Sequence, residues 1–287
     1  MNVPLEVAEA LISIVASDRA QRGVAPLCTV DLWESALSLI CGKKKIGLIS
    51  GFFVPQSAAP ETDGPPGTLV LARALMRMGI DVRVGTDARN IEVMKAAATA
   101  LDFPSEKMDV LDKSGWPSFD PDLLIYIERL GHATDGAYYN MRKEDISVFT
   151  EPLDLLPLTI RVPLLAVGDG GNEVGMGNYR EKLSVMLPDY ADNLCVVGAD
   201  VCLPVDVSNW GGYALSALLS MAEGRWLGQN AHEESEMFRQ MMDAGAVDGV
   251  TCRPSLSADG FPLLIHTEVV AALETLFQSH SQAFFRV

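Results

Sequence analysis

The residues of this sequence that could do chemistry are carboxylates in two glycine-rich loops. Residues 168–178 (GDGGNEVGMGN) hold five glycines in eleven positions, together with Asp169 and Glu173. Residues 60–67 (PETDGPPG) hold Glu61 and Asp63 beside a Pro-Pro pair. Such glycine content is incompatible with a regular helix or strand and lets a backbone approach a ligand closely. Carboxylate and amide oxygens suit a hard cation or a polar substrate, so we expect a ligand to bind these loops.

The elements around these loops explain why the carboxylates should meet. Short apolar runs predict buried strands, which alternate with segments of helical spacing, so we expect a parallel sheet. The expected strands cover residues 46–49, 80–84, 108–111, 123–127, 162–167 and 194–197. Nearly every one runs into an acidic residue: Glu61 and Asp63, Asp87, Glu128, Asp169 and Glu173, and Asp200. Parallel sheets bind ligands outside the carboxyl ends of their strands, so the sequence predicts a carboxylate pocket there, around one or two divalent metal ions.

The predicted fold class is α/β, with an open, mostly parallel, Rossmann-like sheet and helices on both faces. Helical spacing at residues 4–16 and 31–40 predicts an N-terminal helical appendage over residues 1–44. Residues 45–287 would then form the catalytic domain, unless the whole chain is one continuous domain. Further helices are expected near residues 69–78, 89–100, 211–222, 232–244 and 262–277.

Composition excludes several classes of function. The 22 Lys and Arg against 38 Asp and Glu give a net charge of −16, which argues against nucleic acid or an anionic membrane as a partner. No G-x-G-x-x-G or P-loop motif occurs, so no nucleotide cofactor is expected, and no G-x-S-x-G suggests a serine hydrolase. The expected partner is a small molecule, and a homo-oligomer is left open.

The metal and the compartment follow from residue types. Five cysteines without a C-x-x-C pair and four histidines without an H-x-x-x-H pair argue against zinc, so Mg²⁺ or Mn²⁺ is expected. Reduced thiols and an N-terminus without early basic residues predict a cytoplasmic protein. The mitochondrial matrix is not excluded for a eukaryotic source.

Some candidates have an equally good structural explanation. Asp87 and Asp200 could simply cap helices, and Glu128-Arg129 could be a plain ion pair. His132, in a flexible loop, is either an acid/base or an exposed bystander, and Asn209 either faces the site or caps a helix. For the carboxylates of the two glycine-rich loops, function is the better interpretation, because turns alone rarely require such a backbone.

Three stretches taken together resemble the D-glutamate cyclase C-terminal domain family. They are residues 60–67, the Ile-Glu-Arg of 127–129 and residues 168–178, and the Ser-Asn-Trp-Gly of 208–211 also fits. The resemblance covers roughly residues 45–252, and the two longer motifs are specific. Leu130 stands where a proline is expected after Glu-Arg. The resemblance implies a lyase that interconverts D-glutamate and 5-oxo-D-proline with loss or gain of water, and it implies a bound metal.

This chemistry can be matched to residues as a hypothesis. The metal would be held by Asp63, Asp169 and Glu173, and Glu61 or Glu128 would act as general base. Arg129 would clamp the substrate carboxylate, and the backbone amides of Gly170 and Gly171 would stabilise an oxyanion. His132 is a further catalytic candidate, and the remaining substrate-binding candidates are Thr62, Gly64, Asn172 and Asn209. Two alternatives stay open: a metal-dependent phosphoester hydrolase, and a non-catalytic binding protein for an acidic amino acid or a cation.

Overall fold

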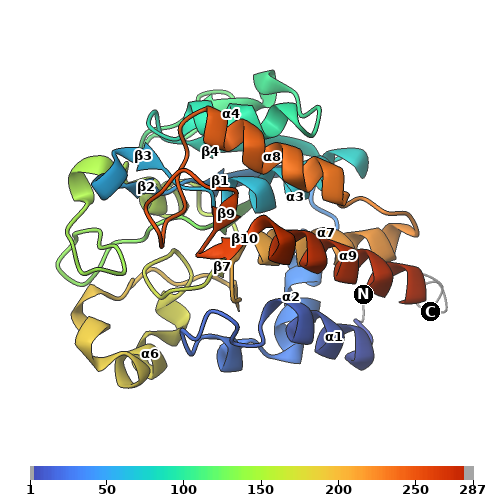
Figure 1. Ribbon diagram of the computed structural model, residues 1–287, viewed down its shortest axis with the longest axis horizontal. Coiled ribbons are helices and arrows are strands. Elements are labelled where there is room, and N and C mark those ends of the chain that lie inside the picture. Colours follow the sequence, from blue (N-terminus) through green and yellow to red (C-terminus); the bar gives the residue numbers. More distant parts are fainter. Residues whose placement is uncertain (1–2, 281–287) are drawn as a thin grey trace.

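The computed structural model describes residues 3–280 and contains a six-stranded, all-parallel sheet with helices around it (Figure 1). The sheet strands are β1 (Lys45–Ser50), β4 (Asp81–Thr86), β5 (Met108–Val110), β6 (Leu123–Ile127), β7 (Leu164–Gly168) and β8 (Val201–Pro204). Two small antiparallel pairs are formed by β2 (Phe53–Val54) with β3 (Ala59–Pro60), and by β9 (Ser257–Ala258) with β10 (Phe261–Pro262). The Rossmann-like fold class is confirmed.

The helices account for the crossovers that a parallel sheet requires. They are α1 (Leu5–Val15), α2 (Val30–Ile40), α3 (Pro65–Arg77), α4 (Ile91–Thr99), α5 (Leu156–Ile160), α6 (Arg180–Met186), α7 (Ser208–Glu223), α8 (Ala231–Asp243) and α9 (Leu263–His280). Helix α8 begins with a full capping box, in which Asn230 and Glu233 each bond the other's backbone. In the described part of the chain, no helix combines the length and the apolar character needed to span a bilayer.

The order of the strands decides where a ligand can bind. The sheet runs β5-β4-β1-β6-β7-β8, so the chain moves outward from β1 to one edge and then returns to continue on the other side. The order therefore reverses between β1 and β6, which pair in parallel. In open α/β sheets the crevice at such a switch point, beyond the carboxyl ends of the strands, is the usual ligand site.

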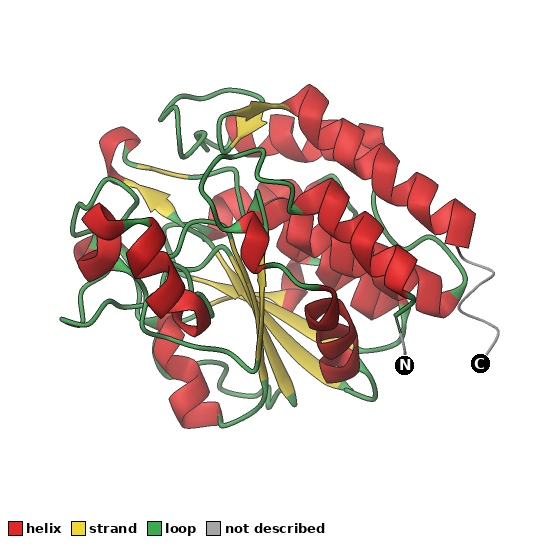
Figure 2. Cartoon of the chain, turned by 90° about the horizontal axis from the view of Figure 1, so that it is seen from below, coloured by secondary structure: helices red, strands yellow, loops and turns green. Residues whose placement is uncertain are grey.

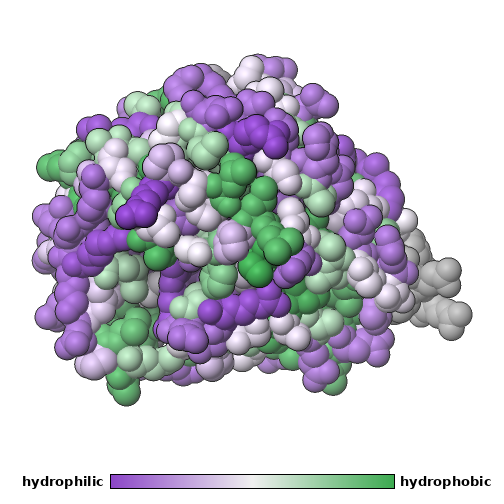
Figure 3. All heavy atoms as spheres, in the orientation of Figure 1, coloured by the Kyte–Doolittle hydropathy of each residue, from purple (hydrophilic) through white to green (hydrophobic). Residues whose placement is uncertain are grey.

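The two faces of the sheet are covered differently, as the view from below shows (Figure 2). One face packs its alternate side chains, such as Leu48 and Ile125, into a large core shared by α1–α4 and α7–α9. The other face, with Ile49 and Tyr126, packs against short helices and irregular loops. On the surface shown in Figure 3, hydrophilic residues predominate, and apolar ones gather near the middle, around β9, β10 and the beginning of α9.

The two N-terminal helices are present, and they share the large core with α7 and α9. The buried residues Leu11 and Leu37 belong to the same cluster as the sheet residues. A boundary at residues 44 and 45 stays a prediction, and this packing favours the alternative of one continuous domain.

One expected strand is wrong. Residues 194–197 are irregular, and the last strand is β8, at Val201–Pro204. The apolar run misled because Leu194 and Cys195 are buried although the chain is irregular there, with the Cys195 amide bonded to the Gly171 carbonyl, while Val196 is 37% exposed. In consequence Asp200 precedes its strand, where it accepts a hydrogen bond from the Leu164 amide at 2.7 Å, and it lies at the opposite edge from the pocket.

Candidate active site

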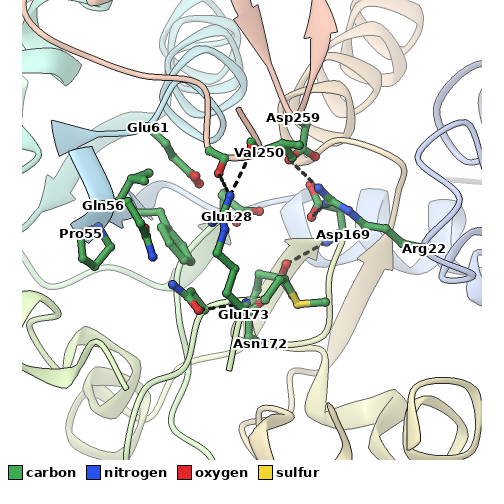
Figure 4. Close-up of a pocket in the computed structure, with 16 residues that line it drawn as sticks. Arg22, Pro55, Gln56, Glu61, Glu128, Asp169, Asn172, Glu173, Val250 and Asp259 are labelled. Atoms are coloured by element: carbon green, nitrogen blue, oxygen red, sulfur yellow. Dashed lines mark hydrogen bonds and ion pairs between the residues drawn. The ribbon is translucent and has the colours of Figure 1, made fainter. Parts of the chain in front are cut away.

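A cavity of about 270 Å³ lies beyond the carboxyl ends of the strands, and acidic side chains line it (Figure 4). The residues expected from the sequence that line it are Glu61, Glu128, Asp169, Asn172 and Glu173. Their loops follow β1, β6 and β7, which are adjacent strands of the sheet. The prediction that carboxylates from separate loops converge is therefore correct for these strands.

Three of the carboxylates could hold one ion. Asp63, Glu128 and Asp169 each offer an oxygen, and these three atoms lie within 4.8 Å of one another. Asp63 and Asp169 are 3% and 2% exposed, and Glu128 is 6% exposed. Asp63 lies just behind the cavity wall, next to the two carboxylates that line it.

The start of helix α7 fixes two of these carboxylates. The Ser208 amide donates to Asp63 Oδ2 at 3.0 Å and to Asp169 Oδ2 at 2.9 Å, and the Asn209 amide donates to Asp63 Oδ1 at 2.8 Å. The first amides of a helix have no partner inside the helix, and the helix dipole favours an anion there. Asp63 and Asp169 thus cap α7, and their spacing is set by one backbone amide.

Close contact between α3 and α7 reinforces this spacing. The Asn209 side chain accepts from the Gly64 and Gly67 amides at 3.0 and 2.9 Å, so it ties the first turn of α3 to α7. Gly67 and Gly212 lie against each other, and a Cβ at Gly212 would come within 2.4 Å of the Gly67 carbonyl oxygen. Asn209 therefore organises the loop and does not line the cavity.

Glu128 is held in an unfavourable environment. Its φ of 47° lies in the left-handed region, which is uncommon for a residue with a side chain, and its Oε2 is buried without a hydrogen-bond partner. Gly64, with φ 97°, leaves room for it, since a Cβ there would lie 2.8 Å from the Glu128 Cβ. Backbone strain and an unpaired buried carboxylate at one residue favour a functional role.

Glu173 has a different environment from the one we expected. Its carboxylate accepts hydrogen bonds from the Gly170 and Gly171 amides, both at 2.7 Å. These amides, which the sequence suggested for an oxyanion, are therefore occupied by an anion of the same loop. Glu173 shapes the loop that presents Asp169, and the three-carboxylate group contains Glu128 where we expected Glu173.

Burial raises the pKa of the pocket carboxyl groups. Desolvation is the main cause for Glu61, Glu128 and Asp169, whose pKa values all lie well above the usual range, and repulsion from neighbouring carboxylates adds to it. For Asp63, desolvation raises the pKa to about 7, although bonds from the α7 amides oppose the shift. Without a cation, some of these groups keep their protons near neutral pH.

The sequence analysis missed two residues that complete the pocket. Arg22, from the segment between α1 and α2, forms an ion pair with Asp169 and another with Asp259, the latter at 2.6 Å. Asp259 lies in the turn between β9 and β10, and its Oδ2 is buried without a partner. Nothing local marks either residue, because each is far in sequence from the glycine-rich loops and reaches the site only through tertiary packing.

Other candidates lie elsewhere. Arg129 is 1% exposed and does not line the cavity, because it pairs with Asp87 at 2.7 Å and donates to the Gly51 and Glu151 carbonyls. His132 also lies outside the cavity and bonds Asp154 through Nδ1 at 2.6 Å. The roles suggested for Arg129 and His132 stay predictions, and their positions do not favour them.

The remaining two candidates support the loops. The Thr62 hydroxyl donates to the Ser257 carbonyl at 2.7 Å, and the Gly64 amide is bonded to Asp63 and Asn209. Both are buried and neither lines the cavity. They hold Asp63 in place, so any effect on a substrate would be indirect.

The donor set fits a divalent oxygen-ligated cation. Three carboxylates converge, one with an orphaned buried oxygen, and the nearby Arg22 offsets only part of their charge. Carboxylate oxygens suit Mg²⁺ and Mn²⁺, whereas the group contains neither histidine nor cysteine, the ligands zinc prefers.

The fold and this site define a Rossmann-like α/β protein with an acidic pocket at its switch point. Residues 11–274 match the family model described as "D-glutamate cyclase-like, C-terminal", and the chain belongs to this family. The match includes α2 and most of α1, so the N-terminal helices belong to the family region.

Two relatives are informative to different degrees. The chain is 33% identical over 234 residues to a human protein named "D-glutamate cyclase, mitochondrial". The alignment covers 73% of this chain and 38% of the relative. The chain thus spans well under half the length of that relative. A solved exopolyphosphatase-related protein from Bacteroides fragilis aligns over 91% of this chain and 62% of its own, with a TM-score of 0.45 and 10% identity. That likeness is too weak to bear on function.

Proposed function

We propose that this protein is a D-glutamate cyclase-like lyase that interconverts D-glutamate and 5-oxo-D-proline plus water with the help of a divalent cation. The observation that carries the proposal is the buried group of Asp63, Glu128 and Asp169 at the switch point of the sheet. The family supports the reaction class, and the human relative's name supplies the substrate.

Charge explains why a cation belongs in this reaction. D-Glutamate and its lactam both carry a carboxylate, and the cavity walls already hold five acidic side chains: Glu61, Glu128, Asp169, Glu173 and Asp259. Every wall carboxylate that is ionised would repel an anionic substrate. Mg²⁺ or Mn²⁺ bound by Asp63, Glu128 and Asp169 would neutralise this charge and polarise the carbonyl that reacts.

Glu61 is the best candidate for moving protons. Its side chain reaches the cavity, no hydrogen bond to its carboxylate occurs among residues 3–280, and burial raises its pKa. A protonated Glu61 can give its proton to the hydroxyl that leaves the γ-carboxyl carbon as water. The neutral amine forms the new C–N bond and gives up one proton, which restores the protonated Glu61. In the reverse direction the Glu61 carboxylate takes a proton from the attacking water.

The cavity suits a small ligand. At about 270 Å³ it is at the low end for small-molecule pockets, and Phe52 and Val54 give it an apolar side. The compartment stays a prediction. We expect the cytoplasm, and the mitochondrial matrix is the alternative that agrees with the name of the human relative.

The direct test is turnover. Purified protein is incubated with each enantiomer of glutamate and of 5-oxoproline, with Mn²⁺, with Mg²⁺ or with chelator, and the products are resolved by chiral chromatography. We expect conversion of the D-compounds only, dependent on metal. Glu92→Gln, at an exposed position on α4, is the matched control for pocket variants. No conversion of any compound with metal present would refute the lyase, and binding of the compounds without turnover would favour a binding protein.

A further inference from the structure

Arg22 lines the cavity and pairs with Asp169. Building on the proposed function, we propose that Arg22 receives the substrate carboxylate and that a cation bound at Asp169 releases Arg22 for this task. In the absence of a cation the guanidinium takes the cation's place beside Asp169. The sequence suggested Arg129 for the carboxylate, but Arg129 is enclosed by its own partners.

The segment that carries Arg22 is built to present it. Gln21 and Gly23, on either side, have φ values of 54° and 75°, and Asp18 has 64°. The turn is closed by hydrogen bonds from the Gln21 amide to the Asp18 carbonyl and from the Gly23 amide to the Asp18 carboxylate. The Ser17 amide anchors it to Asp206, just after β8. Two positive-φ residues with side chains in one short turn, Asp18 and Gln21, are unfavourable on their own, so the side chain that the turn directs inward is a reason to keep them.

The guanidinium stands at the wall of the cavity. Its side chain is 19% exposed, it lines the cavity, and it enters from the side opposite Pro55 and Gln56 (Figure 4). Its two ion pairs, with Asp169 and Asp259, use its terminal nitrogens. Arg142, which also lines the cavity, donates to the Gly249 and Val250 carbonyls. Arg22 is thus the arginine of the cavity that is bound to carboxylates.

Asp169 cannot serve two cations equally. It pairs with Arg22 and is also one of the three carboxylates that converge for an ion. A divalent ion on Asp169 weakens the attraction for the guanidinium and adds repulsion between like charges. The Arg22 nitrogen that pairs with Asp169 is then free. Because each terminal nitrogen carries two hydrogens, the guanidinium can keep Asp259 and bind a substrate carboxylate through both terminal nitrogens.

The consequence is coupling between the two ligands. If the ion frees Arg22 and Arg22 binds the substrate, then the ion strengthens substrate binding, and the substrate must strengthen ion binding by the same factor. Removal of the guanidinium should abolish the part of this coupling that Arg22 carries. It should also make the empty pocket a better ion site, because one competing positive charge is lost.

The test compares Arg22→Gln with Arg19→Gln, which removes the same charge from the same segment. Arg19 is exposed, and its guanidinium lies over the Trp210 ring, outside the cavity. Mn²⁺ affinity is measured by titration calorimetry without substrate, and 5-oxo-D-proline affinity by equilibrium dialysis with and without saturating Mn²⁺. For Arg22→Gln we expect Mn²⁺ binding at least about 5-fold tighter and 5-oxo-D-proline binding at least about 10-fold weaker, as for loss of a close charge pair. Arg19→Gln should match the wild type.

Several results would overturn the inference. Unchanged Mn²⁺ affinity in Arg22→Gln would show that the guanidinium does not compete with the ion, and unchanged 5-oxo-D-proline affinity would show that it does not hold the substrate. If Arg22→Gln fails to fold in a melting experiment, Arg22→Lys keeps the charge but not the bidentate geometry, and we expect weaker 5-oxo-D-proline binding with Mn²⁺ affinity near wild type. Equal 5-oxo-D-proline binding by Arg22→Lys and the wild type would count against the bidentate pair. Failure of the lyase reaction itself would appear separately, as absence of turnover in the wild type.

Discussion

Glu128 and Arg129 are neighbours in the sequence and both are buried, yet their side chains enter opposite environments. Arg129 pairs with Asp87 and donates to two backbone carbonyls through its terminal nitrogens, so its charge is compensated although its buried Nε has no partner among the described residues. Glu128 faces other carboxylates, keeps an orphaned oxygen, and has a strained backbone. A buried charge with its partners supports the fold, whereas a buried charge without them marks a place where a ligand completes the structure.

The largest effect is expected from a substitution of Glu128, the carboxylate that lacks a partner. Glu128→Gln should lower turnover of 5-oxo-D-proline by about 10³-fold, as loss of one preorganised electrostatic group does. The metal-free variant should melt at the same temperature as the wild type or higher, because a buried, repelled carboxylate is removed. Chiral chromatography and thermal melting measure the two effects. A large loss of stability would show that Glu128 supports the fold.

The second prediction concerns the ion pair of Arg129 with Asp87. Arg129→Met should lower the free energy of unfolding by about 3–5 kcal/mol, because Asp87 would stay buried without its charged partner. The double variant Asp87→Asn, Arg129→Met should recover part of the loss, and urea unfolding compares the three proteins. A cost under about 1 kcal/mol, typical of an exposed pair, would contradict the assignment.

The third prediction concerns pH. Burial raises the pKa of Asp63 from 3.8 to about 7, so the folded protein holds a proton that the unfolded chain has lost. The metal-free protein should therefore lose stability as the pH rises from about 4 to 7, by about 2–4 kcal/mol. Mn²⁺ at pH 7 should reverse the loss, and Glu61→Gln should flatten the dependence. A melting temperature that rises over this pH range in chelator would refute it.

The smallest effect concerns His266 in the core, where the pH dependence of stability has the opposite sign to that of Asp63. His266 accepts a hydrogen bond from Trp210 Nε1 at 2.9 Å, and burial lowers its pKa to about 4. Its neutral form is favoured in the folded state, so its contribution should fade as the pH falls from 6.5 to 4. The difference in unfolding free energy between wild type and His266→Gln should shrink by about 1–3 kcal/mol over this range. A constant difference in urea unfolding would contradict it.

The sequence predicted those parts of the site that depend on strand ends. Glu61, Asp63, Glu128 and Asp169 follow β1, β6 and β7, and the carboxyl edge of a parallel sheet brings them together. The prediction for Asp200 was wrong because its strand was misplaced, and an apolar run alone does not distinguish a strand from partly buried irregular chain.

The rest depends on contacts that spacing does not encode. Arg129 and Glu173 have the right types for a site, but their partners, Asp87 and the Gly170 and Gly171 amides, are known only in the folded protein. Arg22 and Asp259 come from opposite ends of the chain and meet over Asp169. In each case the sequence shows the type of the residue but not the residues that it contacts in the folded protein.

The contact of Gly67 with Gly212 has a consequence for ion size. These glycines let α3 and α7 touch, and the first amides of α7 bind both Asp63 and Asp169. The gap between the two carboxylates is therefore set by two backbones in direct contact, which have little freedom to adjust to a larger radius. Gly212→Ala would separate the helices, and we expect it to shift preference from Mg²⁺ and Mn²⁺ toward the larger Ca²⁺. An unchanged ratio of ion affinities would show that the carboxylates adapt on their own.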